Sequence, residues 1–332
     1  MCEKSNEYLV SIIIPVYGVE KYIERCANSL FAQTYSNIEY VFVNDCTPDR
    51  SIERLNEVLK KNPARKVSVN VVENITNCGL AAVRNIGVKH CHGQFLMHVD
   101  SDDWLDVDVV EKCVKKQIET DADIIAFDRN IYLRDGIRKV SAREANTKEE
   151  FLVQMLRRER EISIWGMLIR TSLYKEHQIA CVEGINMSED YQTSPRLVYY
   201  ANRISILHGV AYNYECRNSK SISATFNEKN VNQEFVTLDV LSDFFENKEP
   251  IYQTAAEYGI LKQLCYFRHN AAYYNLSRLF KKINGDLDKY QATRKKMLPL
   301  PYKIGLAIHS MRLLRCYVSI LKCLKKYIGL IQ

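Results

Sequence analysis

The sequence predicts an α/β fold in which a mostly parallel sheet is flanked by helices and followed by a C-terminal helical extension. Short runs rich in Ile and Val alternate with segments whose apolar residues recur at helical spacing, which is the pattern of βαβ units. The apolar runs are continuous rather than alternating, as is typical of strands buried on both faces of a parallel sheet. The chain has 332 residues, 47% apolar and 26% charged, which suits two domains or one large domain with additions.

The first part of the chain supplies five predicted strands. The first strand, 8–15, is expected to end at Pro15, because proline cannot donate a hydrogen bond to a neighbouring strand. The other strands are expected over residues 38–43, 67–72, 94–99 and 124–127. Helices are expected between them, over residues 20–33, 51–61, 80–90 and 106–120. This order predicts right-handed crossovers between parallel strands.

The second part of the chain is less regular. A polar segment, 135–149, is expected on the surface, and the acids of 183–191 are expected in a loop before a helix at 193–200. The remaining expected elements are a helix at 150–158, an apolar segment at 164–169, a strand at 204–214 and helices from about 230 to 283. The whole pattern predicts two halves of one α/β domain, a helical extension and a basic tail helix, over residues 1–128, 129–225, 226–300 and 301–332.

Cysteine and histidine spacing excludes the common zinc sites. The eleven cysteines and seven histidines form no CxxC or HExxH pattern. The segment before the first strand is short and polar, so we do not expect it to act as a secretory signal, and no run of about 18 apolar residues predicts a spanning helix. We therefore expect a cytoplasmic protein with reduced thiols, and no nucleic-acid partner.

The centre of the predicted site is the stretch 95–104. An apolar strand ends there in Asp100, Ser101, Asp102 and Asp103. Ligands bind at the carboxyl ends of strands in open α/β folds, and acids at this spacing repel one another unless a cation lies between them. We expect a divalent metal or a nucleotide at this point. The alternative is that one of the acids caps the helix that follows.

Other residues are candidates for contacts with phosphates or a base. Neither a P-loop nor a dinucleotide fingerprint is present, so phosphates must be neutralised by a metal or by an arginine such as Arg84. Asp45, at the end of the second predicted strand, could accept the imide N–H of a uracil, or it could be a turn residue. His98 is expected in the core. Arg217 and Lys220 could contact phosphates or form a solvated turn.

Three motifs follow one another in the first part of the chain, SIIIPVYGVEKYIERCANSLFAQTYSNIEYVFVNDCTPDRS, NCGLAAVRNIGV and HVDSDDW. In this order and with this spacing, they resemble the motifs of the family 2 glycosyltransferases over residues 9–127. Three later segments, IWGMLIRTSLY, EGINMSEDY and YNYECRNSKSIS, resemble the acceptor-side segment and the closing strand of the family more weakly. The resemblance implies the Rossmann-like GT-A fold and a nucleotide-sugar donor.

The resemblance also implies roles for individual residues. The acid motif would be the DxD motif, in which Asp102 or Asp103 holds Mg²⁺ or Mn²⁺, and Asp190 would be the general base. The residues implied around the nucleotide are Pro15, Val16, Tyr17, Glu20, Asp45, Arg84, Asp100 and Ser101. Gly18 and Cys46-Thr47 depart from the family pattern beside the nucleobase and leave its identity open.

On the acceptor side, Trp165 could stack on a sugar or fill the core. Glu189 could contact the acceptor, but Glu189 and Asp190 could also cap the helix that follows them. The predicted function is an inverting glycosyltransferase that moves a sugar from a nucleoside diphosphate, favoured as UDP, to a glycan or lipid-linked glycan in cell-surface polysaccharide synthesis. The alternatives are a non-catalytic nucleotide-sugar or glycan-binding module and a metal-dependent nucleotidyltransferase.

The C-terminal segment is strongly basic. Residues 294–332 contain nine Lys/Arg and no Asp/Glu, and subtracting these nine charges from the net +6 leaves about −3 for the rest. A helix over 311–331 would carry two faces. The basic face has Arg312, Arg315, Ser319, Lys322 and Lys326, and the apolar face has Leu313, Leu314, Tyr317, Ile320, Leu321, Leu324 and Ile328. We expect peripheral contact of residues 303–332 with the inner face of the cell membrane; the alternative is packing on the protein itself or on a second subunit.

Overall fold

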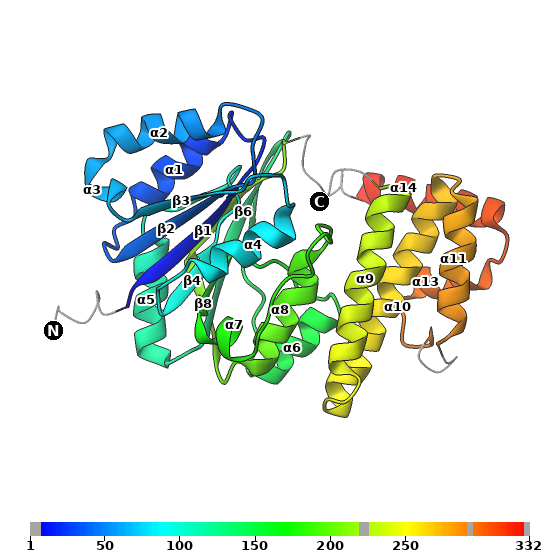
Figure 1. Ribbon diagram of the computed structural model, residues 1–332. Coiled ribbons are helices and arrows are strands. Elements are labelled where there is room, and N and C mark those ends of the chain that lie inside the picture. Colours follow the sequence, from blue (N-terminus) through cyan, green and yellow to red (C-terminus); the bar gives the residue numbers. More distant parts are fainter. Residues whose placement is uncertain (1–7, 219–225, 291–294, 329–332) are drawn as a thin grey trace. The chain divides into compact units, whose positions relative to one another are not determined.

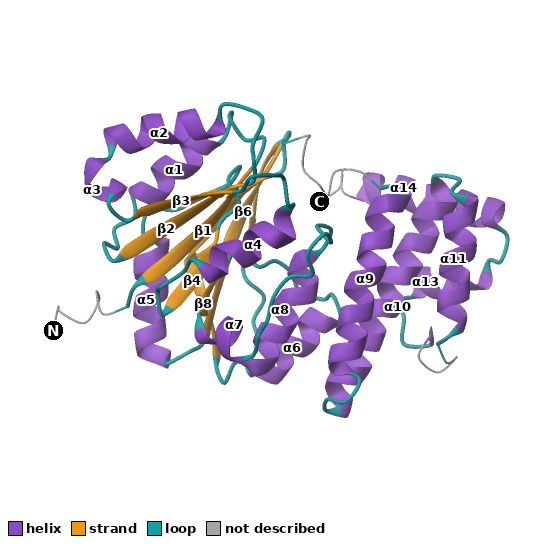
Figure 2. Cartoon of the chain, in the orientation of Figure 1, coloured by secondary structure: helices purple, strands orange, loops and turns teal. Residues whose placement is uncertain are grey.

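A computed structural model describes residues 8–218, 226–290 and 295–328 (Figure 1). The chain divides into two compact units, Met1–Leu152 with Ile162–Ala224 and Val153–Glu161 with Thr225–Gln332. The first unit is α/β, and the second is helical (Figure 2). Among the described residues, no helix is both long and apolar enough to cross a membrane.

The first unit contains one sheet. Its strands are β1 (Val10–Val16), β2 (Ile38–Asn44), β3 (Val69–Glu73), β4 (Phe95–His98), β5 (Trp104–Leu105), β6 (Ile124–Leu133), β7 (Gly136–Val140), β8 (Met167–Arg170) and β9 (Ile204–Glu215). The order across the sheet is β3-β2-β1-β4-β8-β6-β9-β5, and β7 pairs with β6. Strands β1 to β4 pair in parallel, which confirms the predicted α/β fold with a mostly parallel sheet. Strand β8 is antiparallel to both β4 and β6, which the sequence did not predict.

Helices cover both faces of this sheet (Figure 1). They are α1 (Ile23–Phe31), α2 (Ser51–Lys61), α3 (Pro63–Lys66), α4 (Leu80–Lys89), α5 (Val109–Thr120), α6 (Lys148–Leu156), α7 (Ser172–Glu176) and α8 (Glu189–Tyr200). Ile12 and Ile14 on one face of β1 join the main core with α1, α2 and α5. Ile13 points to the other face and meets Gly87 of α4, where a Cβ would collide with the Ile13 side chain. Glycine therefore lets α4 lie close to β1.

Strand β1 does not end at Pro15 but continues to Val16, so that prediction is wrong. Backbone groups of alternate residues point to the same neighbouring strand. The carbonyl of Ile13 accepts a hydrogen bond from the Val99 amide on the β4 side (2.9 Å), and Pro15 points to that side as well. Because β4 ends at His98, the N–H that Pro15 lacks would have had no strand partner.

Two other predicted segments differ from the structure. The surface segment 135–149 contains β7, which forms an exposed hairpin with β6. Helix α8 begins at Glu189 rather than at residue 193, so its two acids lie in the first helical turn and not in a loop. Acids in the first turn interact favourably with the positive end of the helix dipole, which explains the earlier start.

The second unit is a bundle around one long helix. Its helices are α9 (Glu228–Phe245), α10 (Pro250–Tyr273), α11 (Ser277–Asp288), α13 (Leu300–Ala307) and α14 (Met311–Ile328). Helix α10 contacts all four of the others. Its Arg268 is buried and donates hydrogen bonds to the carbonyls of Gly305 (2.7 Å) and Ile308 (2.8 Å), which fixes the end of α13.

The predicted tail helix exists as α14, but its surface differs from the prediction. Leu314 and Val318 are buried where α14 packs on α10. Leu314 is therefore not part of an open apolar face, and the packing alternative holds for this side of the helix. Lys322, predicted on the basic face, lies over the Tyr273 ring of α10 at 3.4 Å.

Candidate active site

The acid motif forms a tight turn between β4 and β5. The Asp103 amide donates a hydrogen bond to the Asp100 carbonyl (3.0 Å), which closes the turn. The Asp100 amide donates to the hydroxyl of Tyr212 on β9 (3.0 Å). The turn therefore lies at the carboxyl end of β4 and is attached to a strand that comes more than one hundred residues later.

Asp103 is a fully buried residue within this turn. Its carboxylate accepts hydrogen bonds from the Tyr212 hydroxyl (2.7 Å) and from the Glu215 amide (2.7 Å). Burial raises the pKa of Asp103 well above its usual range, and Asp102 and Asp100 raise it further. Both oxygens of Asp103 thus bind β9.

Asp102 is partly exposed, whereas Asp103 is fully buried. One carboxylate oxygen accepts a hydrogen bond from the Asn218 side chain (2.9 Å), and the backbone carbonyl accepts one from Arg25 (2.6 Å). Burial raises the pKa of Asp102, and the nearby Asp100 raises it further. This side chain keeps capacity for another ligand, because its second oxygen accepts no hydrogen bond from a described side chain.

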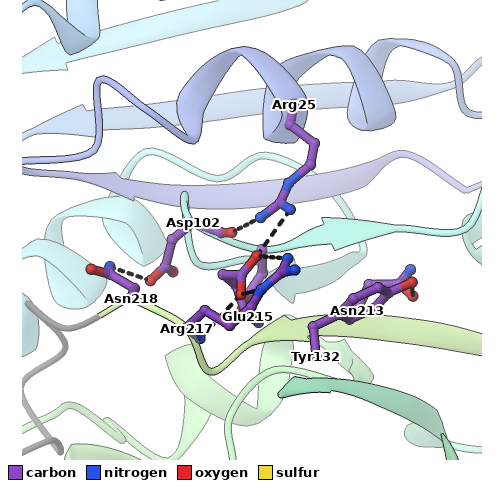
Figure 3. A network of polar contacts seen from close by, with 8 residues as sticks. Arg25, Asp102, Tyr132, Asn213, Glu215, Arg217 and Asn218 are labelled. Carbon is purple, nitrogen blue, oxygen red and sulfur yellow. Dashed lines mark hydrogen bonds and ion pairs between the residues drawn. The ribbon is translucent and has the colours of Figure 1, made fainter. Parts of the chain in front are cut away.

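A cationic network supports the same turn from outside (Figure 3). Arg25 forms an ion pair with Glu215 (3.1 Å), and its guanidinium lies over the Trp104 ring at 3.6 Å. Arg217 binds both oxygens of Glu215 at 2.6 Å each, and this pairing lowers the pKa of Glu215 to about 2. Sequence reasoning missed Arg25 and Glu215, which are 190 residues apart. Lys220 lies outside the described residues.

Arg84 of α4 joins the acid turn to α8. It is 2% exposed and forms ion pairs with Asp100 (2.9 Å) and Glu189 (3.1 Å). Burial disfavours the charge, but Asp100 and Glu189 hold the pKa of Arg84 well above its usual range. Its Nη1 atom is buried and forms no hydrogen bond with any described residue. An orphaned guanidinium N–H of this kind is suited to a ligand oxygen.

The two adjacent acids of α8 have different surroundings. Glu189 is buried and paired with Arg84, whereas Asp190 is partly exposed. Burial raises the pKa of Asp190 well above its usual range, Glu189 raises it further, and Arg84 opposes both. The positive charge of Arg84 therefore acts on Asp100 after β4 and on both acids of α8.

Helix α4 is also held to the segment before α8 by asparagines that the sequence did not reveal. The Asn186 side chain accepts a hydrogen bond from the Ala81 amide (3.0 Å), 105 residues earlier. Asn85 donates to the Cys181 carbonyl (2.9 Å) and accepts from the Cys181 amide (2.8 Å). Gly79, with a φ of +85°, lies against Asn186, and a Cβ there would collide with it. These contacts fix Arg84 relative to α8.

The acid turn and Arg84 lie in a segment that matches a known protein family. The sequence model of glycosyl transferase family 2 matches residues 11–177. The chain belongs to glycosyl transferase family 2. The matched region includes the acid turn and Arg84, while the acids of α8 lie beyond it.

Curated relatives of the chain include glycosyltransferases. GlyA of Streptococcus pneumoniae is 26% identical over 315 residues, which is 89% of this chain and 44% of GlyA. The poly(ribitol-phosphate) beta-N-acetylglucosaminyltransferase TarS of Staphylococcus aureus is 28% identical over 209 residues, covering 61% of this chain and 35% of TarS. The chain thus spans less than half the length of either relative.

Solved structures share the fold. S. aureus TarS 1–349 in complex with UDP-GlcNAc matches with a TM-score of 0.74 at 20% identity, covering 96% of this chain and 92% of that one. The mannosyltransferase PcManGT from Pyrobaculum calidifontis, in complex with GDP-Man and Mn²⁺, matches with a TM-score of 0.52 at 13% identity, covering 94% and 86%. The GT-A fold expected from the resemblance is confirmed.

Most of the other residues that the family resemblance implies around the nucleotide lie at the carboxyl ends of β1 and β2. Pro15 and Val16 are buried, while Tyr17 and Glu20 are exposed. The buried carboxylate of Asp45 holds the loop before α4. It accepts hydrogen bonds from the Asn74 side chain (2.9 Å) and the Cys78 and Gly79 amides (2.8 Å each). Asp45 therefore has a structural role whether or not it also contacts a base, and Ser101 is buried in the acid turn.

Two aromatic candidates lie beside the acid turn of the family 2 fold. Trp165 stacks on Tyr212, with ring centroids 4.4 Å apart, and on Tyr214, at 5.2 Å. It packs against the core but is only partly buried. His98 is buried, as expected, with its Nε2 atom 3.1 Å from the Tyr174 hydroxyl, and burial and Arg84 lower the pKa of His98 well below its usual range.

Proposed function

We propose that the chain is an inverting glycosyltransferase that moves a sugar from a UDP-sugar to a hydroxyl of a glycan or lipid-linked glycan in cell-surface polysaccharide synthesis. The observation that carries this proposal is the buried Arg84, which pairs with Asp100 after β4 and with Glu189 of α8. The pairing supports a common site for Asp100, as the donor-side acid, and Asp190, which follows Glu189 in the chain. Transfer requires that the donor and the group that activates the acceptor be held together.

Several contacts support a nucleotide at the first turns of the sheet. One Asp45 oxygen accepts two hydrogen bonds, and the other accepts one, from Gly79. A carboxylate oxygen has two lone pairs, so the second oxygen has room for the imide N–H of uracil. TarS, in complex with UDP-GlcNAc, supports UDP, whereas PcManGT, in complex with GDP-Man, shows that the fold also takes another base.

Asp102 fits a divalent metal better than Asp103 does. Asp103 uses both oxygens to bind β9, whereas only one oxygen of Asp102 accepts a hydrogen bond from a described side chain. Among the described residues, no three His, Cys, Asp or Glu side chains converge on a metal site. Mg²⁺ in nucleotide sites is typically held by one or two carboxylates together with substrate phosphates, so Asp102 suffices as the anchor. When bound, Mg²⁺ or Mn²⁺ would neutralise charge on the departing diphosphate.

Asp190 supplies the base in this proposal. The acceptor oxygen attacks the anomeric carbon, the bond from that carbon to the diphosphate oxygen breaks, and the acceptor proton passes to the Asp190 carboxylate. Burial and Glu189 raise the pKa of Asp190, whereas Arg84 lowers it and so favours the ionised form that can accept a proton. One displacement from the side opposite the diphosphate inverts the anomeric centre, as in inverting hydrolysis. In this proposal the partly exposed ring of Trp165 stacks on an acceptor sugar.

The proposal includes a location in the cytoplasm, at the inner face of the cell membrane. A lipid-linked acceptor presents its glycan close to the bilayer, and the basic C-terminal segment provides a peripheral contact there.

A donor screen tests the reaction. The full chain is incubated with UDP-, GDP- and dTDP-sugars and Mg²⁺ or Mn²⁺, and released nucleoside diphosphate is measured. Asp190→Ala should lower transfer by about 100-fold or more, because general base catalysis contributes that much, while donor binding is retained. Asp102→Ala should lower both donor binding and transfer.

The control is Glu176→Ala, which removes an exposed acid of α7 and should transfer normally. Full transfer by Asp190→Ala would refute its role as the base. Donor binding without release of any nucleotide product would indicate a binding module, and release of pyrophosphate would indicate a nucleotidyltransferase.

A further inference from the structure

The helical unit leaves a group of large apolar side chains exposed on α13 and α14. Their exposed fractions lie between 41% and 66%, although each could bury fully in a core. They are named here the α13–α14 face and consist of Leu300, Ile304, Leu313, Ile320 and Leu324. Exposed apolar residues gathered in one region, rather than scattered singly, indicate a binding surface.

Packing of the unit does not account for these side chains. Helix α14 is held on α10 by the buried Leu314 and Val318, and the segment before α13 is held by the buried Leu298. Arg268 fixes the C-terminal end of α13 through two backbone carbonyls. Both helices are thus anchored by other residues, and the α13–α14 face remains outside.

The exposed side chains of the two helices border one another. The Tyr317 hydroxyl of α14 donates a hydrogen bond to the Pro301 carbonyl at the start of α13 (3.1 Å). Leu313 and Ile320 lie one helical turn to either side of Tyr317, and Leu324 continues the same stripe. Leu300 adjoins Pro301, and Ile304 lies one turn further along α13. The Tyr317–Pro301 contact therefore joins both stripes into one surface.

The charged side chains that α13, α14 and the described segment before them contribute are all positive. Lys296, Lys303, Arg312 and Arg315 are exposed and form no ion pair with a described residue. Residues 295–324 contain no Asp or Glu. An apolar surface bordered by unpaired cations is the pattern of helices that lie in the interface of an anionic membrane.

We propose that the α13–α14 face lies in the headgroup region of an anionic bilayer, with its Leu and Ile side chains inserted and the four cations at the lipid headgroups. This inference rests on the location given under Proposed function and makes it specific. Helical spacing in the sequence placed Leu314 on the apolar face, but the proposed membrane-binding surface does not include Leu314. The surface does include α13, for which the sequence predicted no apolar face.

Two other occupants fit these residues less well. A second copy of the chain would bring two sets of unpaired cations towards each other across a two-fold axis, and their repulsion would oppose association. A soluble anionic polymer would match the cations but leave the five Leu and Ile side chains in contact with polar groups or water. A bilayer surface satisfies both features.

Vesicle flotation of the full chain tests the proposal. Vesicles of phosphatidylcholine mixed with phosphatidylglycerol are compared with phosphatidylcholine alone. The double variant Leu313→Ser/Ile320→Ser should bind the mixed vesicles at least about tenfold more weakly, since burial of these side chains in lipid is lost. Arg312→Gln/Arg315→Gln should lower binding to the mixed vesicles and change binding to phosphatidylcholine little.

The matched control is Val236→Ser/Ile251→Ser, which makes the same kind of change at exposed apolar residues of α9 and α10. This control should float like the wild type. Because all these residues are exposed, each variant should keep the wild-type melting temperature, so a loss of flotation reports on the surface and not on folding.

Three results would overturn the proposal. They are unchanged flotation of Leu313→Ser/Ile320→Ser, a concentration-dependent dimer that this variant abolishes, and binding to soluble polyphosphate that competes fully with vesicles. Asp190→Ala should float normally. A failure of the catalytic proposal therefore appears in nucleotide release alone, and a failure of the membrane proposal appears in flotation alone.

Discussion

Replacing Glu189 with alanine removes one of the two carboxylates that neutralise the buried Arg84. The guanidinium is 2% exposed, so water cannot take the place of the lost partner. Removing one member of a buried ion pair typically costs about 3–5 kcal/mol, and we expect about 3 kcal/mol because Asp100 still lies 2.9 Å from Arg84. At about 2–4 °C per kcal/mol for a unit of this size, the melting temperature should fall by about 6–12 °C.

Differential scanning calorimetry measures this change, with Glu176→Ala as the control at an exposed acid of the same unit. Asp190→Ala provides a second comparison, because Asp190 adjoins Glu189 but is partly exposed, and it should melt close to the control. If Glu189→Ala melts within about 2 °C of Glu176→Ala, Arg84 does not depend on this carboxylate, and the stated energy of the buried pair is refuted.

Two further predictions concern other parts of the α/β unit. Arg25→Ala removes a hydrogen bond to the acid turn, so isothermal titration calorimetry should show about tenfold weaker UDP binding. Arg25→Lys should recover part of this affinity, and unchanged UDP binding by Arg25→Ala would contradict the prediction. Hydrogen bonds with Glu144 and Asp128 raise the pKa of His208. The protonated imidazole should therefore stabilise the folded unit fully below the unfolded pKa of about 6.5, and this stabilisation should be lost as the pH rises through the folded pKa. His208→Asn should therefore lower the melting temperature more at about pH 6 than at about pH 9, unlike the exposed His309→Asn, and an equal loss at both would refute the linkage.

Much of the fold could be predicted because its signals are local. The continuous apolar strands, the helical spacing between them and the acids directly after β4 are each contained in short stretches of sequence. The start of α8 at Glu189 was missed because the composition of residues 183–191 is typical of a loop. In the structure, the helix dipole stabilises the two acids in the first turn of α8. The antiparallel β8 was missed because a short apolar run carries no information about strand direction.

The sequence by itself determined that three acids follow a buried strand, that Asp190 lies far along the chain, and that the C-terminal segment is cationic. Only the tertiary structure decided that Asp103 is bound by β9, that Arg84 pairs with Glu189, and that α14 buries Leu314 instead of exposing it. The physical reason is the same in each case. A buried charge or apolar side chain must find its partner wherever the folded chain brings one, and Arg84 and Glu189 meet across 105 residues that no local pattern connects.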